Sequence, residues 1–133
     1  MQKELLKELD LKEVQDIIST WLVKTGILTD QTRFETFAKL EEETGEVYLE
    51  VQSMDKERLG SELADVIFTC YILAIQSGID INTAVLAQLE KQYKQYPPYK
   101  AELLVKDGKN GKEALKELKK EYLDNLADNV VDC

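Results

Sequence analysis

Two groups of acidic residues have a spacing that could hold a divalent cation. The first is Glu42-Glu43-Thr44-Gly45-Glu46, and the second is Glu62-Leu63-Ala64-Asp65. Residues three or four positions apart lie on the same side of a helix, so each group would present its carboxylates together. Carboxylate oxygens suit Mg²⁺ and Mn²⁺, and Mg²⁺ keeps open positions that a phosphate substrate can fill. The spacing therefore points to metal-assisted phosphate chemistry.

The two groups differ in how strongly they indicate a site. An acidic triplet such as the first is common on solvated helix surfaces, although like charges at this spacing cost helix stability. The second group is more informative, because Glu62 and Asp65 interrupt a segment that is apolar almost all round. No Lys or Arg lies between Leu59 and Ile75. Burying a bare carboxylate is expensive, so buried carboxylates are normally paired or bound to metal.

The composition excludes several other chemistries. The chain of 133 residues contains no histidine, which rules out Ser-His or Cys-His nucleophiles and Glu-x-x-His di-iron sites. Acidic residues outnumber basic ones 26 to 17, giving a net charge of −9 that would repel a phosphate backbone. We therefore expect no nucleic-acid partner. Cys70 and Cys133 form no disulfide or zinc pattern, and Cys70 is expected to be a buried hydrophobic residue.

Neither a signal peptide nor a membrane span is expected. The segment from Met1 to Asp10 is charged and lacks an apolar core. The longest apolar stretch, Val66 to Ile75, is too short to cross a bilayer. These features favour a cytoplasmic protein without a membrane partner.

The elements that must position the acidic groups are predicted to be helices. Apolar residues recur at helical spacing, no strand pattern is present, and Gly26, Gly78 and Pro97-Pro98 act as stop signals. The predicted helices cover residues 10–24, about 30–54, 56–76, about 80–96 and 112–126, with a linker at 100–111. A short connection around Asp55 makes the second and third helices antiparallel. Glu43 and Glu46 can then face Glu62 and Asp65.

These residues resemble a known family. The segment Lys39-Leu-Glu-Glu-Glu-Thr-Gly-Glu-Val47, followed by Glu62-Leu-Ala-Asp65-Val-Ile, is similar to the signature of the MazG-type all-α nucleoside triphosphate pyrophosphohydrolases. That signature is Glu-Glu-x-x-Glu, a gap, and Glu-x-x-Asp. The resemblance covers roughly Glu13 to Pro97. It implies an all-α fold with a four-helix MazG-like bundle core at residues 1–99, and leaves residues 100–133 as the linker and an additional C-terminal helix that packs on the core or a partner subunit.

The resemblance also implies an activity. A nucleoside triphosphate would be cleaved between its α and β phosphates, giving the monophosphate and pyrophosphate. Its Mg²⁺ ligands, with Mn²⁺ as a substitute, would be Glu43, Glu46, Glu62 and Asp65. Glu42 would lie beside the site and orient the attacking water or help to hold a further metal. A homodimer or homotetramer with sites near subunit contacts is implied as well.

Other residues are candidates for binding the substrate. Lys39, Lys91 and Lys94 could contact the phosphates, although each fits equally well as a surface lysine. Family members often carry an Arg shortly before the Tyr-Pro that closes the fourth helix, where this chain has Lys94-Gln95-Tyr96-Pro97. Trp21 and Phe34 could stack on a nucleobase, although a Trp on the first helix is more often a core residue.

Three functional interpretations follow, in this order. The first is a Mg²⁺-dependent pyrophosphohydrolase for (d)NTPs, with a role in nucleotide-pool house-cleaning. The second is a non-catalytic all-α oligomerisation or regulatory module that retains the acidic cluster for binding metal. The third is a helical bundle without metal. The residues indicate neither the preferred base or sugar nor the number of metal ions.

Overall fold

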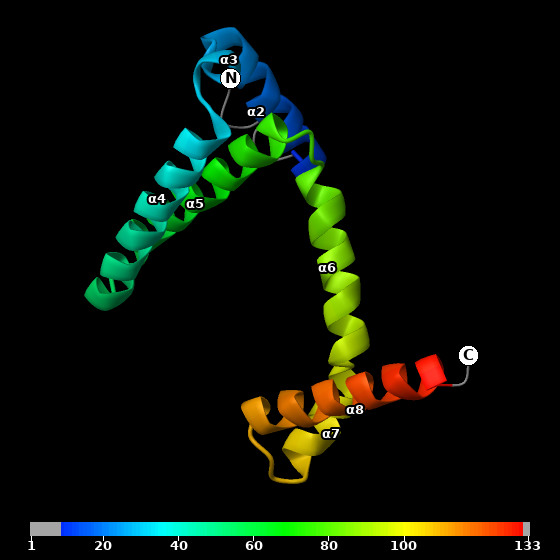
Figure 1. Cartoon of the computed structure of the whole chain (residues 1–133). Helices are drawn as coiled ribbons and strands as arrows, with labels where there is room; N and C mark the ends of the chain where they lie inside the picture. Colours follow the sequence, from blue (N-terminus) through cyan, green and yellow to red (C-terminus); the bar gives the residue numbers. More distant parts are fainter. Residues whose placement is uncertain (1–8, 132–133) are drawn as a thin grey trace. The chain divides into compact units, whose positions relative to one another are not determined.

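The computed structural model describes residues 9–131, and the backbone in this range is helical without strands (Figure 1). The all-α class predicted from the sequence is confirmed. The helices are α2 (Leu11–Thr25), α3 (Ile27–Asp30), α4 (Arg33–Ser53), α5 (Lys56–Gln76), α6 (Ile81–Gln95), α7 (Pro98–Lys106) and α8 (Gly111–Val131).

The chain forms two compact units, which divide between Asn82 and Thr83. The first contains α2 to α5 and therefore both acidic groups, and the second contains most of α6 together with α7 and α8. The sequence-based division into residues 1–99 and 100–133 stays a prediction.

Capping residues set the start and end of α2. Asp10 Oδ1 accepts a hydrogen bond from the Glu13 backbone N–H at 2.8 Å, and Glu13 Oε2 accepts one from the Asp10 N–H at 3.2 Å. This reciprocal pair satisfies two backbone donors that a helix start leaves free. Gly26 ends the helix with φ of 77°, a left-handed conformation that glycine adopts without steric cost. The predicted helix over 10–24 is thus confirmed to within a residue.

The core of the first unit joins α2 to α5. Ile18 and Leu22 from α2 pack with Tyr71 and Ile72 from α5, and all four side chains are buried. The Gln15 side chain ties α2 to the loop after α5: Nε2 donates to Ile79 O at 3.0 Å, and Oε1 accepts from Ile81 N at 3.1 Å. Burial of apolar surface and these two hydrogen bonds hold α2 against the C-terminal half of α5.

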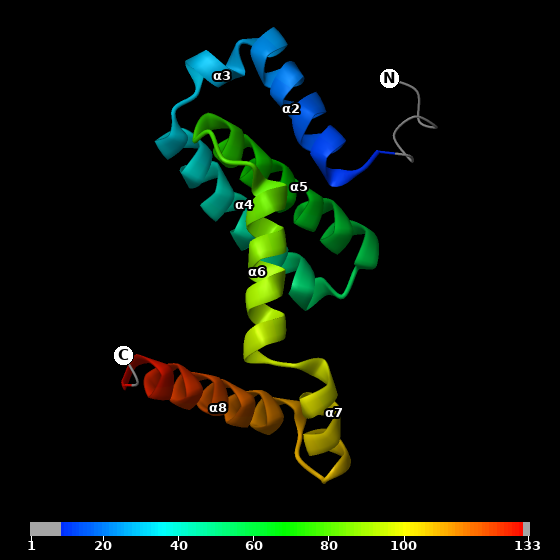
Figure 2. The ribbon, with the colours of Figure 1, turned by 90° about the vertical axis from the view of Figure 1, so that its right-hand side faces the viewer.

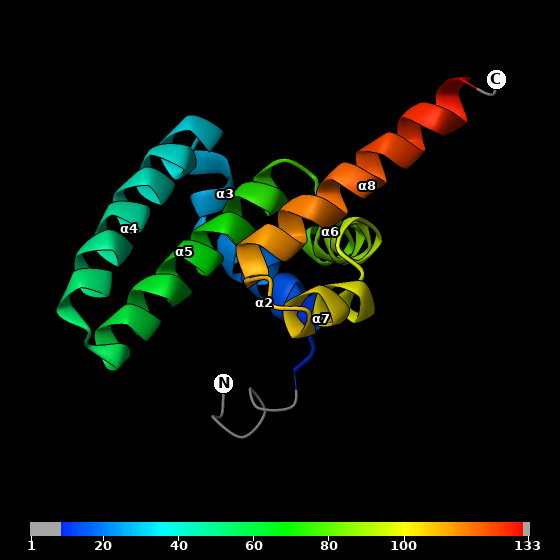
Figure 3. The same ribbon diagram turned by 90° about the horizontal axis from the view of Figure 1, so that it is seen from below.

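The helices α4 and α5 form the antiparallel hairpin that the sequence predicted, and they lie side by side in Figures 1 and 3. Thr32 caps α4, since its Oγ1 accepts from the Glu35 N–H at 3.1 Å. Asp30, where the sequence placed the start of this helix, instead belongs to α3, a one-turn helix that the sequence pattern did not reveal. Helices α2 and α3 lie at the end of the hairpin where α4 begins (Figure 1).

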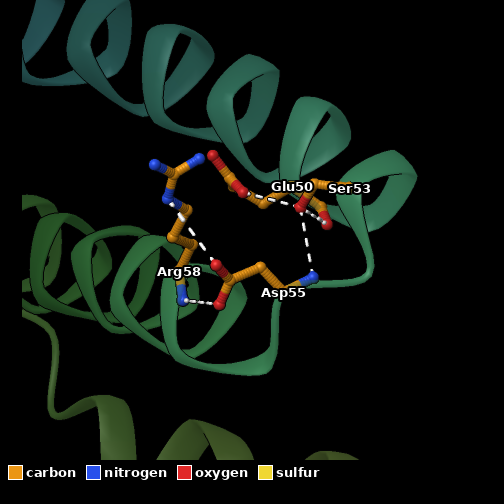
Figure 4. A network of polar contacts seen from close by, with 4 residues as sticks. All are labelled: Glu50, Ser53, Asp55 and Arg58. Atoms are coloured by element: carbon orange, nitrogen blue, oxygen red, sulfur yellow. Dashed lines mark hydrogen bonds and ion pairs between the residues drawn. The ribbon is translucent and has the colours of Figure 1, made fainter.

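A polar network closes the hairpin at its other end (Figure 4). Ser53 Oγ donates to Glu50 and accepts from the Asp55 N–H at 3.2 Å. Asp55 Oδ1 caps α5 by accepting from the Arg58 N–H at 3.1 Å, and its Oδ2 lies 3.7 Å from Arg58 Nε. Met54 takes φ of 59° between the helices. The turn residues thus supply one hydrogen bond to the end of α4 and one to the start of α5.

Helix α5 is long and apolar enough, by length and composition, to cross a bilayer. The sequence-based expectation considered only Val66 to Ile75, a run too short to span a bilayer, and the expected absence of a membrane partner stays a prediction. Such a composition is also typical of the central helix of a soluble bundle. The carboxylates of Glu62 and Asp65 lie against Glu43 of α4, so one face of α5 meets polar groups within the hairpin.

The second unit corrects the predicted linker. Residues 100–106 of that segment belong to α7, in which Pro98 occupies a first-turn position that tolerates the missing N–H. Helix α6 does end before Pro97-Pro98 as predicted. Helices α7 and α8 fold back on each other (Figure 2), with Ala114 and Leu118 of α8 buried. Lys100 Nζ pairs with Glu121 Oε1 at 2.8 Å across them.

Candidate metal centre

Three carboxylates from the paired helices converge in the first unit. Glu43 of α4 and Glu62 and Asp65 of α5 each offer one oxygen, and these three oxygens lie within 4.8 Å of one another. Glu43 is buried, with 8% of its surface exposed, whereas Glu62 is half-buried and Asp65 is exposed. The hairpin therefore places an acidic site at the edge of the buried surface, as the residue spacing predicted.

Two oxygens of this site have no hydrogen-bond partner. Oε2 of Glu43 and Oε2 of Glu62 are both buried and accept no hydrogen bond. The ion pairs found within residues 9–131 do not include either residue. A buried carboxylate oxygen without a donor costs free energy, and coordination to a cation removes this cost. The donor set, all carboxylate oxygen, fits a hard divalent ion such as Mg²⁺ or Mn²⁺.

The electrostatics of the cluster indicate uncompensated negative charge. Burial raises the pKa of Glu43, and the neighbouring carboxyls of Glu46 and Asp65 raise it further, while Lys39 acts in the opposite direction. The Glu46 carboxyl, by hydrogen bonding, and then burial raise the pKa of Glu62 to about 6. Charges of one sign at close range disfavour the ionised forms. A divalent cation would reverse this effect by favouring the carboxylates.

Glu46 and Glu42 occupy different positions around the cluster. The half-buried side chain of Glu46 lies close enough to Glu43 and to Glu62 to raise the pKa of both, but it is not among the three residues whose oxygens converge. Glu42 is exposed beside Glu43 on α4. The roles predicted for them, Glu46 as a ligand and Glu42 as a water-orienting group, stay predictions.

A cavity of about 370 Å³ adjoins the carboxylates. Glu43 and Asp65 form part of its wall, and the other lining residues are Trp21, Ile27, Gln31, Lys39, Phe68, Thr69 and Ile72. This volume lies within the range of roughly 300–1,000 Å³ that is usual for small-molecule sites. The wall is largely apolar on the side of α2 and α5 and charged near the cluster. Such a cavity can take an organic group while its charged end receives phosphates.

The predicted substrate-binding residues lie in different parts of the structure. Lys39 and Trp21 both line the cavity, and the Trp21 ring meets the edge of Phe68 with centroids 5.7 Å apart. Phe34 is 86% exposed and lines a different, apolar cavity. Lys91 and Lys94 are exposed on α6 in the second unit and stay predictions.

Five residues of the cavity wall were not among the predicted site residues: Ile27, Gln31, Phe68, Thr69 and Ile72. Gln31 precedes a helix, Thr69 is a polar residue in an apolar helix, and Phe68 looks like an ordinary core residue. Of these, Thr69 gave a usable signal, because it lies one turn after Asp65 and continues the polar strip of Glu62 and Asp65. Gln31 and Phe68 gave none, since their positions depend on how α2 and α3 meet the hairpin.

Comparison with known families decides the assignment. The family profile of the MazG nucleotide pyrophosphohydrolase domain matches residues 31–99, which include both acidic groups and cover more than half of the chain. The chain belongs to the MazG family. No curated protein and no solved structure gives a significant match. The MazG match begins at Gln31 and spans α4 to α6, so α2, which contributes Trp21, precedes the matched segment.

Proposed function

We propose that this MazG-family protein is a Mg²⁺-dependent pyrophosphohydrolase that converts (d)NTPs to (d)NMPs and pyrophosphate. The observation that carries the proposal is the convergence of Glu43, Glu62 and Asp65, with two buried oxygens that lack partners, beside a cavity of nucleoside size. Membership of a nucleotide pyrophosphohydrolase family supports the same reaction.

Each of the five carboxylates in the two acidic groups has a role in this proposal. Glu43, Glu62 and Asp65, joined by Glu46, would hold the ion, and Glu42 would orient the attacking water. When bound, Mg²⁺ supplies charge neutralisation for the triphosphate and makes the attacking water more acidic. One water is consumed: its oxygen bonds to a phosphorus of the α–β anhydride, the bridging P–O bond breaks, and one proton is released. The protein contributes mainly positioning and electrostatic stabilisation, as phosphoryl transfer requires.

The phosphates also need cations, because a protein of net charge −9 repels a polyanion. Lys39 supports this role, since it lines the cavity together with Glu43 and Asp65. We include Lys91 and Lys94 as further candidates on their sequence positions alone. Trp21 forms an aromatic wall that a base can contact.

A homodimer or homotetramer is part of the proposal. Large apolar side chains along the hairpin are exposed, among them Phe37, Val51, Leu63 and Ile67, and an oligomer interface would cover such surface. Size-exclusion chromatography with light scattering tests this directly. We also propose a cytoplasmic location and a house-cleaning role for the reaction, without a nucleic-acid or membrane partner.

The test of the function is release of pyrophosphate from standard and modified (d)NTPs, with Mg²⁺ and with EDTA. Release that requires Mg²⁺ and stops in EDTA supports the enzyme. If no nucleotide is hydrolysed while Mg²⁺ still raises the melting temperature, the protein is instead a metal-binding module without catalysis. If Mg²⁺ has no effect on melting, the acidic cluster is not a metal site.

A further inference from the structure

Helix α8 carries its basic and acidic residues on two different faces. At about 100° per residue, four lysines share an arc of roughly 100°, which we call the lysine face: Lys112, Lys116, Lys119 and Lys120. The acidic residues occupy the neighbouring arc of roughly 80°: Glu113, Glu117, Glu121, Asp124 and Asp128. Ala114 and Leu118, which are buried, lie on a third side. The lysine face is therefore a continuous basic stripe.

The acidic face has partners within the second unit, and the lysine face has none there. Glu121 pairs with Lys100 of α7 at 2.8 Å, and Glu117 pairs with Lys109, which precedes α8. The four lysines of the lysine face are all exposed, and the ion pairs found within residues 9–131 include none of them. Like charges three or four positions apart on a helix repel each other and cost stability. An acidic partner would remove that cost.

An apolar residue lies within the lysine face. Leu123 falls at the centre of the same arc and exposes 50% of its surface. Protein interfaces combine an apolar centre with a polar rim, and this face has both. A phosphate backbone would leave the leucine uncovered. The lysine face therefore fits a protein surface on which acidic side chains surround an apolar one.

The chain itself carries acidic surface in its first unit. Residues 83–133 contain nine basic and nine acidic residues and so have no net charge. The other eight basic and 17 acidic residues lie in residues 1–82, which hold the whole net charge of −9. Complementary charges orient two surfaces and favour their association. A second copy of the same chain is the partner that this distribution of charge favours.

Helix α4 presents charged and apolar groups at the spacing found on α8. Each helix has two like-charged residues four positions apart and a leucine three positions later: Glu42, Glu46 and Leu49 on α4, and Lys116, Lys120 and Leu123 on α8. Each set extends over ~10 Å, at ~1.5 Å per residue. Glu42 is exposed, Glu46 is half-buried, and Leu49 exposes 61% of its surface. Two helices lying side by side can therefore pair these charges and cover both leucines.

We propose that the lysine face of α8 binds α4 in the first unit of a second copy, and so places Lys116 and Lys120 beside that copy's acidic cluster. This inference rests on the homo-oligomer and the reaction of the proposed function. Glu42 and Glu46 lie beside Glu43 of the cluster, one next to it in the chain and the other almost one turn later. The ammonium groups thus lie where a triphosphate needs cations. In a twofold dimer, each copy completes the site of the other.

The contribution comes from outside the segment that defines the family. The MazG match ends at residue 99, and α8 begins at Gly111. The proposed contact therefore gives the C-terminal part of this chain a role at the site, and three experiments test it.

The first experiment is cross-linking with a carbodiimide, which joins lysine amines to carboxylates in contact. Unlabelled and ¹⁵N-labelled protein are exchanged in high salt until native mass spectrometry shows mixed oligomers, and are then returned to low salt. Peptides that join α8 to α4 should include pairs with one labelled and one unlabelled half. Mixed oligomers without such pairs overturn the inference and leave the proposed oligomer standing, whereas a protein that is monomeric throughout refutes both.

The second experiment compares two double variants of the lysine face. Lys116→Glu with Lys120→Glu reverses the charge and should weaken association of the copies by about tenfold or more at low salt. Lys116→Arg with Lys120→Arg keeps the charge and should associate as wild type does. Circular dichroism checks that both double variants keep their helix content, and analytical ultracentrifugation gives the dissociation constants. Equal constants for the two double variants would overturn the inference.

The third experiment mixes two defective proteins to learn which copy supplies the lysines. Asp65→Asn lacks a carboxylate of the cluster but keeps its lysine face, and the charge-reversed double variant has the opposite defect. In mixed oligomers, the lysine face of Asp65→Asn should serve the intact cluster of its partner. Mg²⁺-dependent release of pyrophosphate should then exceed the sum for the separate proteins by about twofold or more.

Release no greater than that sum, from oligomers shown to be mixed, would overturn the inference. If wild type itself releases no pyrophosphate, the proposed reaction fails, and the labelled cross-links then decide the contact between α8 and α4 by themselves.

Discussion

Glu43 on α4 and Glu62 on α5 face each other across the hairpin, and each keeps one buried oxygen, Oε2, that accepts no hydrogen bond. Two such oxygens on adjacent helices would repel each other in a purely structural bundle. Their placement is explained if a cation completes the site.

Removing one charge at a time should abolish most of the activity. Glu43→Gln, Glu46→Gln, Glu62→Gln and Asp65→Asn should each lower kcat/KM by about a hundredfold or more, because the charge stabilisation by a bound metal is worth several kcal/mol. Helix content, measured by circular dichroism, should stay unchanged. Glu57→Gln on the exposed start of α5 is the matched control. Full activity in any one site variant would remove that residue from the ligand set.

The stability of the metal-free protein should depend on pH through Glu62. Its pKa is raised from 4.5 to about 6, first by the hydrogen-bonded Glu46 carboxyl and then by burial. The folded protein thus keeps a proton that the unfolded chain has lost, and this stabilisation is complete below pH 4.5 and lost as the pH rises through about 6. In EDTA, the melting temperature of wild type should fall from pH 5 to 7 relative to that of Glu62→Gln.

The same two proteins provide the control in Mg²⁺. The ion binds the ionised carboxylates, so wild type should gain stability at pH 7, by about 2.7 kcal/mol at a hundred times the dissociation constant. Glu62→Gln should gain less. If the melting temperatures of wild type and Glu62→Gln in EDTA change in the same way with pH, Glu62 does not titrate with a raised pKa.

Much of this architecture could be predicted from the sequence, because its signals are local. The cap at Asp10, the glycine at Gly26 and the 3.6-residue periodicity specify α2, and the short turn at Asp55 specifies an antiparallel pair. The i, i+3 spacing of Glu62 and Asp65 likewise predicted the side of α5 that meets Glu43.

The features that were missed depend on tertiary context or on an ambiguous signal. Pro98 was interpreted as a terminator, yet the same residue is favoured in the first turn of a helix and begins α7. The position of Gln31 in the cavity depends on the packing of α2 and α3, which periodicity does not describe. Phe37 and Val51 of α4 are exposed although they recur at helical spacing, because periodicity does not say which element covers an apolar face.

Lys39 should contribute to binding of the triphosphate. Lys39→Gln removes the cation that lies with Glu43 and Asp65 on the cavity wall. A charge-assisted contact is worth about 1.5–3 kcal/mol, so kcat/KM should fall by about ten- to hundredfold, mainly through KM. Lys56→Gln, an exposed lysine at the start of α5, is the control. Equal kinetics for the two variants would identify Lys39 as an ordinary surface lysine.

Met54 should be a site at which glycine stabilises the hairpin. It adopts φ of 59° and its side chain is 86% exposed, so it carries left-handed strain with little packing in return. Met54→Gly should increase the free energy of unfolding by about 0.5–1 kcal/mol, the strain relief less the added entropy of the unfolded chain. Chemical denaturation measures the change, and Gly26→Ala, at φ of 77°, should destabilise in contrast. A loss of stability in Met54→Gly would show that the turn is not strained.

Cleavage of the α–β anhydride is tested most directly by identifying the products of a single nucleotide in the presence of Mg²⁺. Phosphorus NMR of a dCTP reaction with wild type, and with Asp65→Asn as the inactive control, distinguishes the two anhydride bonds. Wild type is expected to form dCMP and pyrophosphate in equal amounts, and the variant is expected to form neither. Formation of dCDP and orthophosphate, or equal product formation by Asp65→Asn, would contradict it.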